Sequence, residues 1–147
     1  MARILGLDYG EKRLGFALSD TGEMIALPLR VVVCRRPEDA LKETLNVCAE
    51  TKAERLVVGL PLNMDGSKGP AAQKVLAFVE KIGAQLAIPV CTWDERLSTK
   101  AATAVLIEAG TSRQRRKDVV DKLAAQIMLQ NFLDAQAYAR ERDGLAP

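Results

Sequence analysis

The sequence of 147 residues contains no histidine. This absence excludes the catalytic triads and dyads that use an imidazole base, and it excludes metal sites that are built on histidine. Proton transfer or charge neutralisation in an active site would therefore have to involve Asp, Glu, Lys or Tyr side chains or a bound metal. Sites made of oxygen ligands suit hard cations such as Mg²⁺ and Mn²⁺.

Cysteine and aromatic residues are also scarce, and no apolar run is long enough to span a bilayer. The three cysteines, Cys34, Cys48 and Cys91, form no C-x-x-C pair, so we expect core residues rather than disulfides or a thiolate zinc site. Aromatic residues make up 4% of the chain, so any nucleic acid that such a chain binds would be recognised by shape and backbone rather than by base stacking. Without a signal peptide or span, we expect a cytoplasmic protein with no membrane partner.

What is present fits an ordinary globular chain with one hydrophobic core. Hydrophobic residues make up 48% and charged residues 27%, and the formal net charge is only +2. The charge is unevenly distributed, because the segment Thr111–Lys117 carries four cations and no acid. Such a cluster binds phosphates in some proteins and is a solvated loop in others, and composition alone leaves both interpretations open.

Hydrophobic patterning and turn residues predict an α/β fold with one mixed sheet of five strands covered by helices. Three strands joined by tight turns predict an antiparallel meander, and two later strands follow helical crossovers that enforce parallel pairing. We expect strands at 3–8, 14–19, 25–34, 56–60 and 89–93. We expect helices at 37–52, from Pro70 to Leu86, from Ser98 or Thr99 to Gly110 and, after a basic loop, at 118–142. Residues 1–142 should form a single domain, with a frayed tail at 143–147.

Asp8 is the first candidate for chemistry. It ends the predicted strand at 3–8 and precedes Tyr9 and Gly10. It would therefore stand at the carboxyl edge of a strand, where ligands bind in α/β sheets. The structural alternative is an aspartate that begins the turn and satisfies its own backbone.

Asp121 is the second candidate, because it shares a helical face with the apolar residues Ala125 and Met128. An unpaired carboxylate in such surroundings is costly, and a bound metal would stabilise it. An ion pair with Lys117 or Arg13 would have the same effect, and helix starts favour acids in any case.

The segment Asp94–Ser98 is the third candidate, since it places two acids and Arg96 directly after the last strand. It can bind a cation and a phosphate together, or it can simply complement a helix dipole. In combination the signal is stronger. Asp8, Glu95 and Asp121 come from the first strand, the end of the last strand and the final helix, and they can converge at one sheet edge.

Four motifs carry a family resemblance. They are Gly6–Gly15 with Ser19-Asp20, Val58–Ser67 with Gly69-Pro70, Asp94–Ser98, and Lys117–Lys122 with Ala124-Ala125. In this order, from Arg3 to Leu133, they resemble the motifs of the YqgF family, also called RuvX. Four long motifs in register are far more specific than any one of them.

The resemblance implies an RNase H-like fold and a nuclease, linked to maturation of the 5′ end of small-subunit ribosomal RNA precursor and also described as a Holliday junction resolvase. It implies that Asp8, Glu95 and Asp121 are the active, catalytic acids. Because phosphodiesters resist attack by anions, we expect these three acids to be the ligands of Mg²⁺ or Mn²⁺, with Asp8 bridging two ions. One departure concerns the wider superfamily, in which many members have an acid at the end of the fourth strand. Here that place is Gly59-Leu-Pro61, so Glu95 substitutes from the neighbouring strand.

Several polar side chains near these acids are candidate nucleic-acid contacts, which would make binding sensitive to salt. Asp118, one turn from Asp121, is a weaker metal-ligand candidate. The loop with Asp65 and Gly66 can approach a substrate closely or be a plain surface turn. The candidate contacts are Lys12, Arg13, Asn63, Ser67, Arg96, Arg113, Arg115, Arg116 and Lys117.

Two other functions fit parts of the pattern. A non-catalytic nucleic-acid-binding or ribosome-assembly module would carry the same basic segment. The stretch Asp8–Gly10 followed by Lys12, Arg13 and Gly15 also resembles the phosphate loop of actin-like and sugar-kinase ATPases, which place ATP between two such domains, whereas this chain has the length of one. The residues alone are compatible with structured RNA or branched DNA as substrate, and with a monomer or a homodimer.

Overall fold

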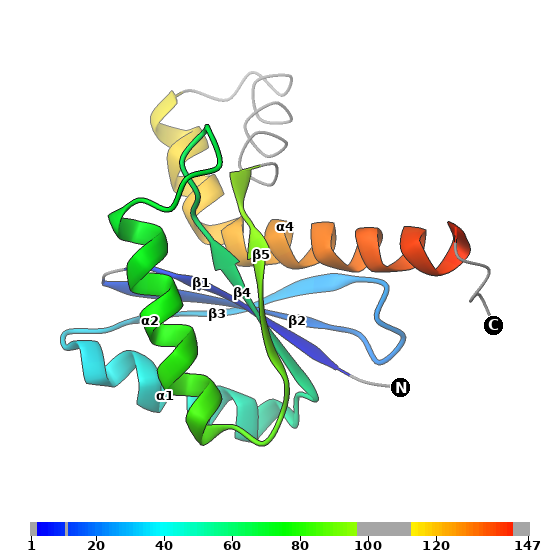
Figure 1. Ribbon diagram of the computed structural model, residues 1–147, viewed down its shortest axis with the longest axis horizontal. Helices are drawn as coiled ribbons and strands as arrows, with labels where there is room; N and C mark the ends of the chain where they lie inside the picture. Colours follow the sequence, from blue (N-terminus) through cyan, green and yellow to red (C-terminus); the bar gives the residue numbers. More distant parts are fainter. Residues whose placement is uncertain (1–2, 11, 97–112, 143–147) are drawn as a thin grey trace.

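The computed structural model describes residues 3–10, 12–96 and 113–142, of which the side chains of residues 113–122 lie outside the description. Five strands form one sheet in the order β3-β2-β1-β4-β5 (Figure 1). The strands are β1 (Ile4–Tyr9), β2 (Arg13–Ser19), β3 (Ala26–Val33), β4 (Arg55–Leu60) and β5 (Val90–Asp94). The helices are α1 (Pro37–Thr51), α2 (Pro70–Gln85) and α4 (Arg113–Arg142).

The predicted mixed sheet is confirmed. β1, β2 and β3 pair as an antiparallel meander, because short turns join them. β4 pairs parallel to β1, and β5 pairs parallel to β4, because α1 and α2 carry the chain back to the start of the next strand. β1 therefore lies in the middle of the sheet, hydrogen-bonded on both sides.

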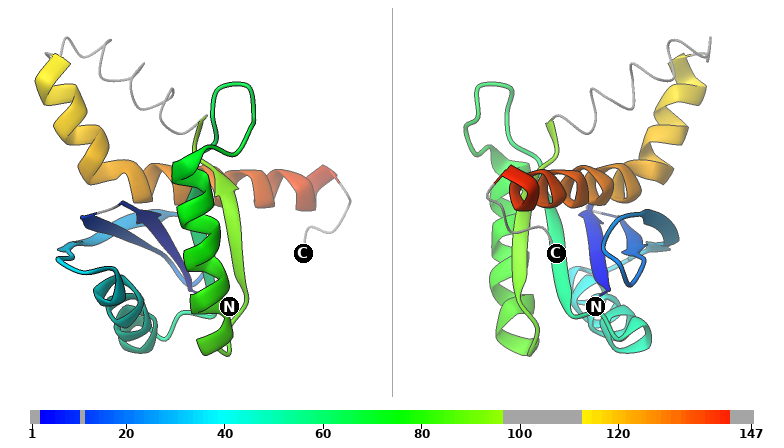
Figure 2. Two further views of the ribbon diagram at one scale, coloured as in Figure 1. Left: turned by 60° about the vertical axis from the view of Figure 1, so that its left-hand side comes forward. Right: turned by 90° about the vertical axis from the view of Figure 1, so that its right-hand side faces the viewer.

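Helices cover both faces of the sheet, with α1 and α2 on one face and α4 on the other (Figure 2). Side chains alternate along β1, so Leu5 and Leu7 pack in the core under α1 and α2, and Ile4 packs against α4. The expected core cysteines are confirmed for Cys34 and Cys48, which are buried. Burial raises the pKa of the Cys48 thiol to about 11, so this thiol remains protonated at neutral pH.

Helix α4 is held on the sheet by apolar packing and by two glutamines that bond the start of β3. The Gln126 side chain donates to the carbonyl oxygen of Ala26 at 3.1 Å. The Gln130 side chain accepts from the Ala26 amide at 2.9 Å and donates to the Met24 carbonyl oxygen at 2.9 Å. Ala125, Met128, Leu129 and Leu133 form the buried face of the helix. These contacts fix the position of the helix across the sheet.

The start of α4 corrects one expectation. Residues 111–117 were expected to form a basic loop, but the helix already begins at Arg113, so Arg115, Arg116 and Lys117 are helical. Arg, Gln and Lys are good helix formers, and no Gly or Pro interrupts the sequence from here to Arg142. The first turns of α4 turn away from the line of the rest of the helix (Figures 1 and 2). The helix expected between Ser98 and Gly110 lies outside the described residues.

Within the described ranges, no helix combines the length and the apolar character that crossing a membrane requires.

The packing of α4 on β1 predicts a steric limit at Gly6. A Cβ atom at Gly6 would lie 3.0 Å from Cβ and 3.3 Å from Cδ2 of Leu129, which is tighter than ordinary contact. We expect Gly6→Ala to lower the free energy of unfolding by about 1–3 kcal/mol, because α4 must shift. Gly83→Ala is the control, since a Cβ there meets nothing within 4 Å, and it should stabilise α2 by up to about 1 kcal/mol. Urea denaturation measures both, and equal stability of the two variants would contradict this packing.

Candidate active site

The structure brings Asp8 and Glu95 together on the face of the sheet that α4 covers. Asp8 is the fifth residue of β1 and lies in register with Gly15 of β2. Glu95 follows β5 directly, and its backbone amide donates to the carbonyl oxygen of Leu60 at 3.1 Å, which extends the β4–β5 pairing. The two carboxyl groups hydrogen-bond to each other. The sequence expectation that these acids converge is thus met for this pair.

Gly59 provides the space in which Glu95 reaches Asp8. Gly59 lies on β4, between β1 and β5, and a Cβ atom there would come within 2.7 Å of Cγ and 2.5 Å of Cδ of Glu95. Any side chain on this residue would therefore occupy the place of the Glu95 carboxyl group. Glu95 can therefore occupy this place only because the fourth strand carries a glycine, and no acid, near its end.

A second glycine flanks Asp8 on the other side. Gly15 of β2 is the register partner of Asp8, and a Cβ atom there would lie 3.7 Å from Cβ of Asp8 and 3.7 Å from Cβ of Ala125. This distance is ordinary van der Waals contact, so a methyl group fits at Gly15, whereas Glu95 already fills the space above Gly59. Asp8 thus stands between two residues without side chains, under the first half of α4.

The electrostatics of the pair are unfavourable without a cation. Burial raises the pKa of Glu95, and the hydrogen bond to Asp8 and the charges of Asp8 and Asp94 raise it further, to about 9. At neutral pH without a bound metal, Glu95 therefore holds its proton and donates it to the Asp8 carboxylate. Two carboxyl groups that compete for one proton form a site with high demand for positive charge.

Asp94 and Arg96, on either side of Glu95, form a separate ion pair. The Arg96 guanidinium donates from Nη2 to Asp94 Oδ2 at 2.7 Å and from Nε at 2.9 Å, and this hydrogen bonding lowers the pKa of the Asp94 carboxyl group. Nη1 of Arg96 donates to the carbonyl oxygen of Met64 at 3.1 Å. Arg96 therefore ties the end of β5 to the loop 61–69. Its predicted contact with nucleic acid remains a prediction.

The loop 61–69 is an ordered turn built from its own polar groups. Asn63 donates from Nδ2 to Ser67 Oγ at 2.9 Å, and Ser67 Oγ donates to Asp65 Oδ1 at 2.6 Å. Gly66 closes the turn with φ of 89°, and its amide donates to the Asn63 carbonyl oxygen at 2.8 Å. Asn63 and Ser67 are exposed, and their side chains hydrogen-bond within the turn. Their contact with nucleic acid remains a prediction. The loop projects beyond the carboxyl ends of β4 and β5, as Figure 1 shows.

The third predicted acid lies in α4, but its side chain is outside the described residues. Position 121 is one helical turn before Ala125, which packs over Gly15 beside Asp8. The backbone of α4 therefore brings Asp121 to the neighbourhood of the acid pair, whereas the contacts of its carboxyl group remain a prediction. The same holds for the side chains of Asp118, Arg113, Arg115, Arg116 and Lys117.

Lys12 and Arg13 lie at the turn between β1 and β2, and both are exposed. Arg13 is the first residue of β2, and the Lys12 carbonyl oxygen accepts from the Cys34 amide at 2.8 Å. They stand at the sheet edge where β1 ends, two and three residues from Gly10. This placement is compatible with the predicted contact to a nucleic-acid backbone.

Among the described residues, no three acidic or thiol side chains lie close enough together to hold a metal ion on their own. The described part of the site offers two carboxylates, from Asp8 and Glu95, and a third ligand would have to come from Asp121. The donor set consists of hard oxygen atoms, and the raised pKa of Glu95 reflects a demand for positive charge. The residues present therefore fit Mg²⁺ or Mn²⁺ and do not fit a thiolate or imidazole metal.

A cavity of about 400 Å³ opens beside Glu95, on the side of α2. It is lined by Tyr9, Gly10, Pro61, Pro70, Ala71, Lys74 and Glu95. Sequence reasoning did not identify Tyr9 and Lys74 as part of the site, and it interpreted Gly59 only as a missing acid. The signal for Gly59 was present, since a glycine at the end of a buried strand indicates close approach of another group.

Comparison with known proteins decides the family. Residues 2–135 match the profile of RuvX, described as Holliday junction resolvase. The chain belongs to the RuvX family. This RuvX-family chain is 46% identical over 134 residues to a protein of Halothermothrix orenii, covering 91% of the chain and 96% of the relative. It is 47% identical over 135 residues to one of Symbiobacterium thermophilum, covering 92% and 94%. Both relatives are named "Putative pre-16S rRNA nuclease".

Solved structures support the fold. The chain is similar to RuvC of Thermus thermophilus, solved with a Holliday junction substrate, with a TM-score of 0.56 and 22% identity over 92% of this chain and 96% of that chain. It is also similar to the fowlpox virus Holliday junction resolvase, with a TM-score of 0.52 and 12% identity over 90% and 99%. At these identities the likeness concerns the fold, and it confirms the expected RNase H-like architecture.

The raised pKa of Glu95 predicts a pH-dependent stability in the absence of metal. A carboxyl group whose pKa is higher in the folded state favours folding while it is protonated, so its contribution is complete below about pH 4.5 and is lost as the pH rises toward 9. We expect the wild type in chelator to lose on the order of 2 kcal/mol between pH 5 and pH 7 through this group. Glu95→Gln keeps a hydrogen-bond donor and should remove this loss.

Thermal unfolding in chelator at pH 5, 7 and 9 measures the effect. The control is Glu80→Gln, which changes an exposed glutamate on α2 and should keep the wild-type pH profile. If Glu95→Gln and wild type lose stability in parallel with rising pH, the acids do not share a proton.

The space above Gly59 predicts a selective effect of one methyl group. Gly59→Ala should displace the flexible Glu95 side chain from Asp8 and so lower nuclease activity by roughly 100-fold, with little change in stability. Gly15→Ala is the matched control on the other side of Asp8, where the new Cβ meets ordinary contacts at 3.7 Å. Mn²⁺ titration by calorimetry and cleavage assays on both variants provide the measurement. Full Mn²⁺ affinity in Gly59→Ala would contradict the arrangement.

Proposed function

We propose that this chain is a divalent-metal-dependent nuclease that hydrolyses phosphodiester bonds in structured nucleic acid. The substrate class that we favour is the precursor of 16S ribosomal RNA, as the names of its relatives suggest. The family resemblance of the sequence motifs points to the 5′ end of this precursor, and the proposed location is the cytoplasm. Branched DNA is the second substrate class, because the family carries the description of a Holliday junction resolvase.

The observation that carries this proposal is the hydrogen-bonded pair of Asp8 and Glu95 at the carboxyl edge of the sheet. A partly buried carboxyl pair is unfavourable without a cation, and Arg96, the sequence neighbour of Glu95, forms its ion pair with Asp94 instead. Such a pair is what a metal-dependent hydrolase needs and what a purely structural sheet edge would avoid.

The chain's own residues have distinct roles in this proposal. Asp8 and Glu95 would hold the metal from two strands, and Asp121 would complete the ligand set from α4. When bound, Mg²⁺ or Mn²⁺ supplies charge neutralisation at the phosphate and an activated water. Glu95 must lose its proton to bind a cation, so metal binding releases a proton near neutral pH. Lys12 and Arg13 at the turn and the cations of α4 would hold the nucleic-acid backbone.

A non-catalytic binding module is the second candidate. The basic residues 113–117 and the exposed Lys12 and Arg13 serve binding without cleavage equally well. The acid pair argues against this function, because the negative charge that the pair keeps without a cation repels phosphates. A nucleotide-binding ATPase is less favoured, because the relatives over nearly the full chain carry a nuclease name.

Replacing the central acid separates cleavage from binding. Asp8→Asn keeps the shape of the side chain but removes the charge, so we expect cleavage to fall below about 1% of wild type while nucleic-acid affinity stays within about threefold. The substrates are a precursor fragment that spans the 5′ end of small-subunit ribosomal RNA and a four-way DNA junction. Each is incubated with Mg²⁺, with Mn²⁺ or with a chelator, and products are resolved on gels.

The control is Asp134→Asn, which changes an exposed aspartate of α4 and should cleave as wild type does. Cleavage that persists in chelator, or in Asp8→Asn, would reject the metal-dependent mechanism. Absence of cleavage by the wild type, together with tight and salt-sensitive binding, would favour the binding module.

A further inference from the structure

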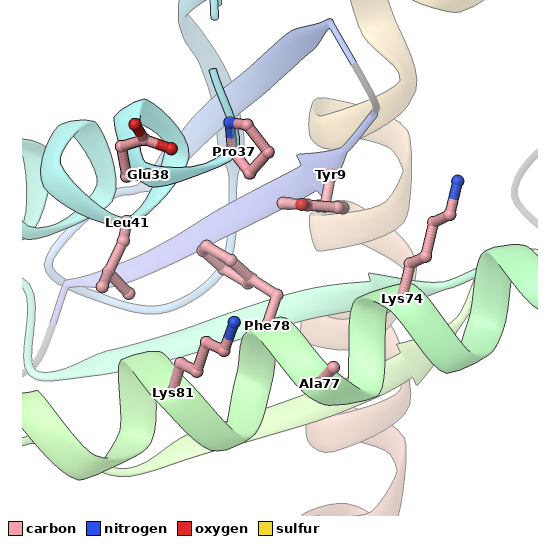
Figure 3. Close-up of a pocket in the computed structure, with 8 residues that line it drawn as sticks. All are labelled: Tyr9, Pro37, Glu38, Leu41, Lys74, Ala77, Phe78 and Lys81. Carbon is pink, nitrogen blue, oxygen red and sulfur yellow. The ribbon is translucent and has the colours of Figure 1, made fainter.

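A cavity of about 590 Å³ lies on the opposite face of the sheet from the acid pair, between α1 and α2. Figure 3 shows it with side chains from β1 and from both helices turned toward it. It is lined by Tyr9, Pro37, Glu38, Leu41, Lys74, Ala77, Phe78 and Lys81. Its volume is in the range of sites that bind small molecules or single nucleotides.

The floor of this cavity is aromatic. Tyr9 follows Asp8 in β1, so strand alternation directs its side chain to the opposite face. Its ring centroid lies 4.6 Å from that of Phe78, with 33° between the ring planes. Phe78 is buried in the core and holds Tyr9 in place, whereas Tyr9 remains partly exposed. A fixed and accessible ring is the kind of surface on which a nucleic-acid base stacks.

The charges around the cavity are divided between its two walls. Lys74 and Lys81 both come from α2, two helical turns or about 10.5 Å apart along the axis. Glu38 comes from α1, where its carboxylate lies 3.7 Å from the Arg36 guanidinium. The α2 wall therefore favours phosphate, and the α1 wall does not.

This cavity is continuous in its lining with the one beside the acid pair. Tyr9 and Lys74 line both, and the other cavity includes Glu95. A polymer that lies against Glu95 can therefore follow Lys74 and Tyr9 around the end of β1 into the space between the helices. A free small ligand would need no such connection, so the arrangement favours a strand over a single nucleotide.

We propose that this cavity binds a single-stranded segment of the nucleic-acid substrate that continues from the scissile phosphate. One base stacks on Tyr9, and Lys81 on the α2 wall binds a phosphate next to it. The inference rests on the proposed nuclease function, because it takes the strand from the acid pair. It adds a preference for a junction between paired and unpaired nucleotides, and it qualifies the expectation that a chain with few aromatic residues does not stack bases.

The test measures binding in chelator, so that cleavage is not required. Duplexes with and without a single-stranded tail of 5′ or 3′ polarity are titrated by fluorescence anisotropy with the full chain. Lys81→Ala should weaken binding of one tailed duplex about three- to tenfold at low salt and reduce the slope of log affinity against log salt by about 0.7. Ala77→Glu should weaken it more than about tenfold, because it places a negative charge in the cavity. Neither variant should change binding of the tail-free duplex.

Matched controls lie outside the cavity on the same two helices. Lys42→Ala removes an exposed lysine from α1, and Ala84→Glu adds an acid to the exposed side of α2. Both should bind all duplexes as wild type does. The inference is overturned if Lys81→Ala and Ala77→Glu behave as these controls, if they weaken tailed and tail-free duplexes equally, or if a free mononucleotide competes as well as the tail.

The result is separable from that of the proposed function. If the protein cleaves nothing but binds tailed duplexes in a way that needs Lys81, the proposed nuclease function is rejected and the proposed single-strand site stands. Metal-dependent cleavage with no effect of Lys81→Ala or Ala77→Glu on any tailed substrate would reject the strand site and leave the nuclease.

Discussion

The candidate site depends on the close approach of two carboxyl groups, those of Asp8 and Glu95, at the end of a sheet whose hydrogen bonds fix the backbone. Asp8 lies on β1, which is hydrogen-bonded on both sides, and Glu95 reaches it across β4 through the space that Gly59 leaves. In solution, two acids would separate to relieve their repulsion. Here the backbone holds the two residues side by side, and burial, together with the hydrogen bond to Asp8 and its charge, raises the pKa of Glu95. The stability of the sheet thereby offsets the unfavourable approach of the two acids, which leaves a preorganised site for a cation.

Strand alternation at the end of β1 places neighbouring side chains on opposite faces of the sheet. Asp8 points toward α4, and Tyr9, the next residue, points toward α1 and α2. One residue step therefore separates the acid pair from an aromatic surface. The end of β1 with the exposed Lys12 and Arg13 is the edge around which a strand would pass from one face to the other.

Much of this could be predicted from the sequence, because periodicity and turn residues report local geometry. The meander, the crossovers and the place of Asp8 follow from patterns within a few residues. The predicted start of α4 at residue 118 was wrong, because the basic side chains at 113–117 are as typical of exposed helix turns as of exposed loops. The role of Gly59 depended on which strand lies beside β4, and the cavity at Tyr9 depended on how α2 packs. Both are long-range relations that a local pattern does not contain.

The position of Gly59 also shows how Glu95, in the proposed site, would take the place of an acid at the end of the fourth strand. What the site requires is a carboxyl group over the α4 face, next to Asp8, and a backbone on β4 close enough to support it. An acid on β4 itself and an acid from β5 that crosses a glycine meet the same requirement from different Cα positions. A side chain on Gly59 and a carboxyl group from Glu95 exclude each other sterically, so the two residues form a single unit. We therefore expect substitutions at one to be tolerated only together with changes at the other.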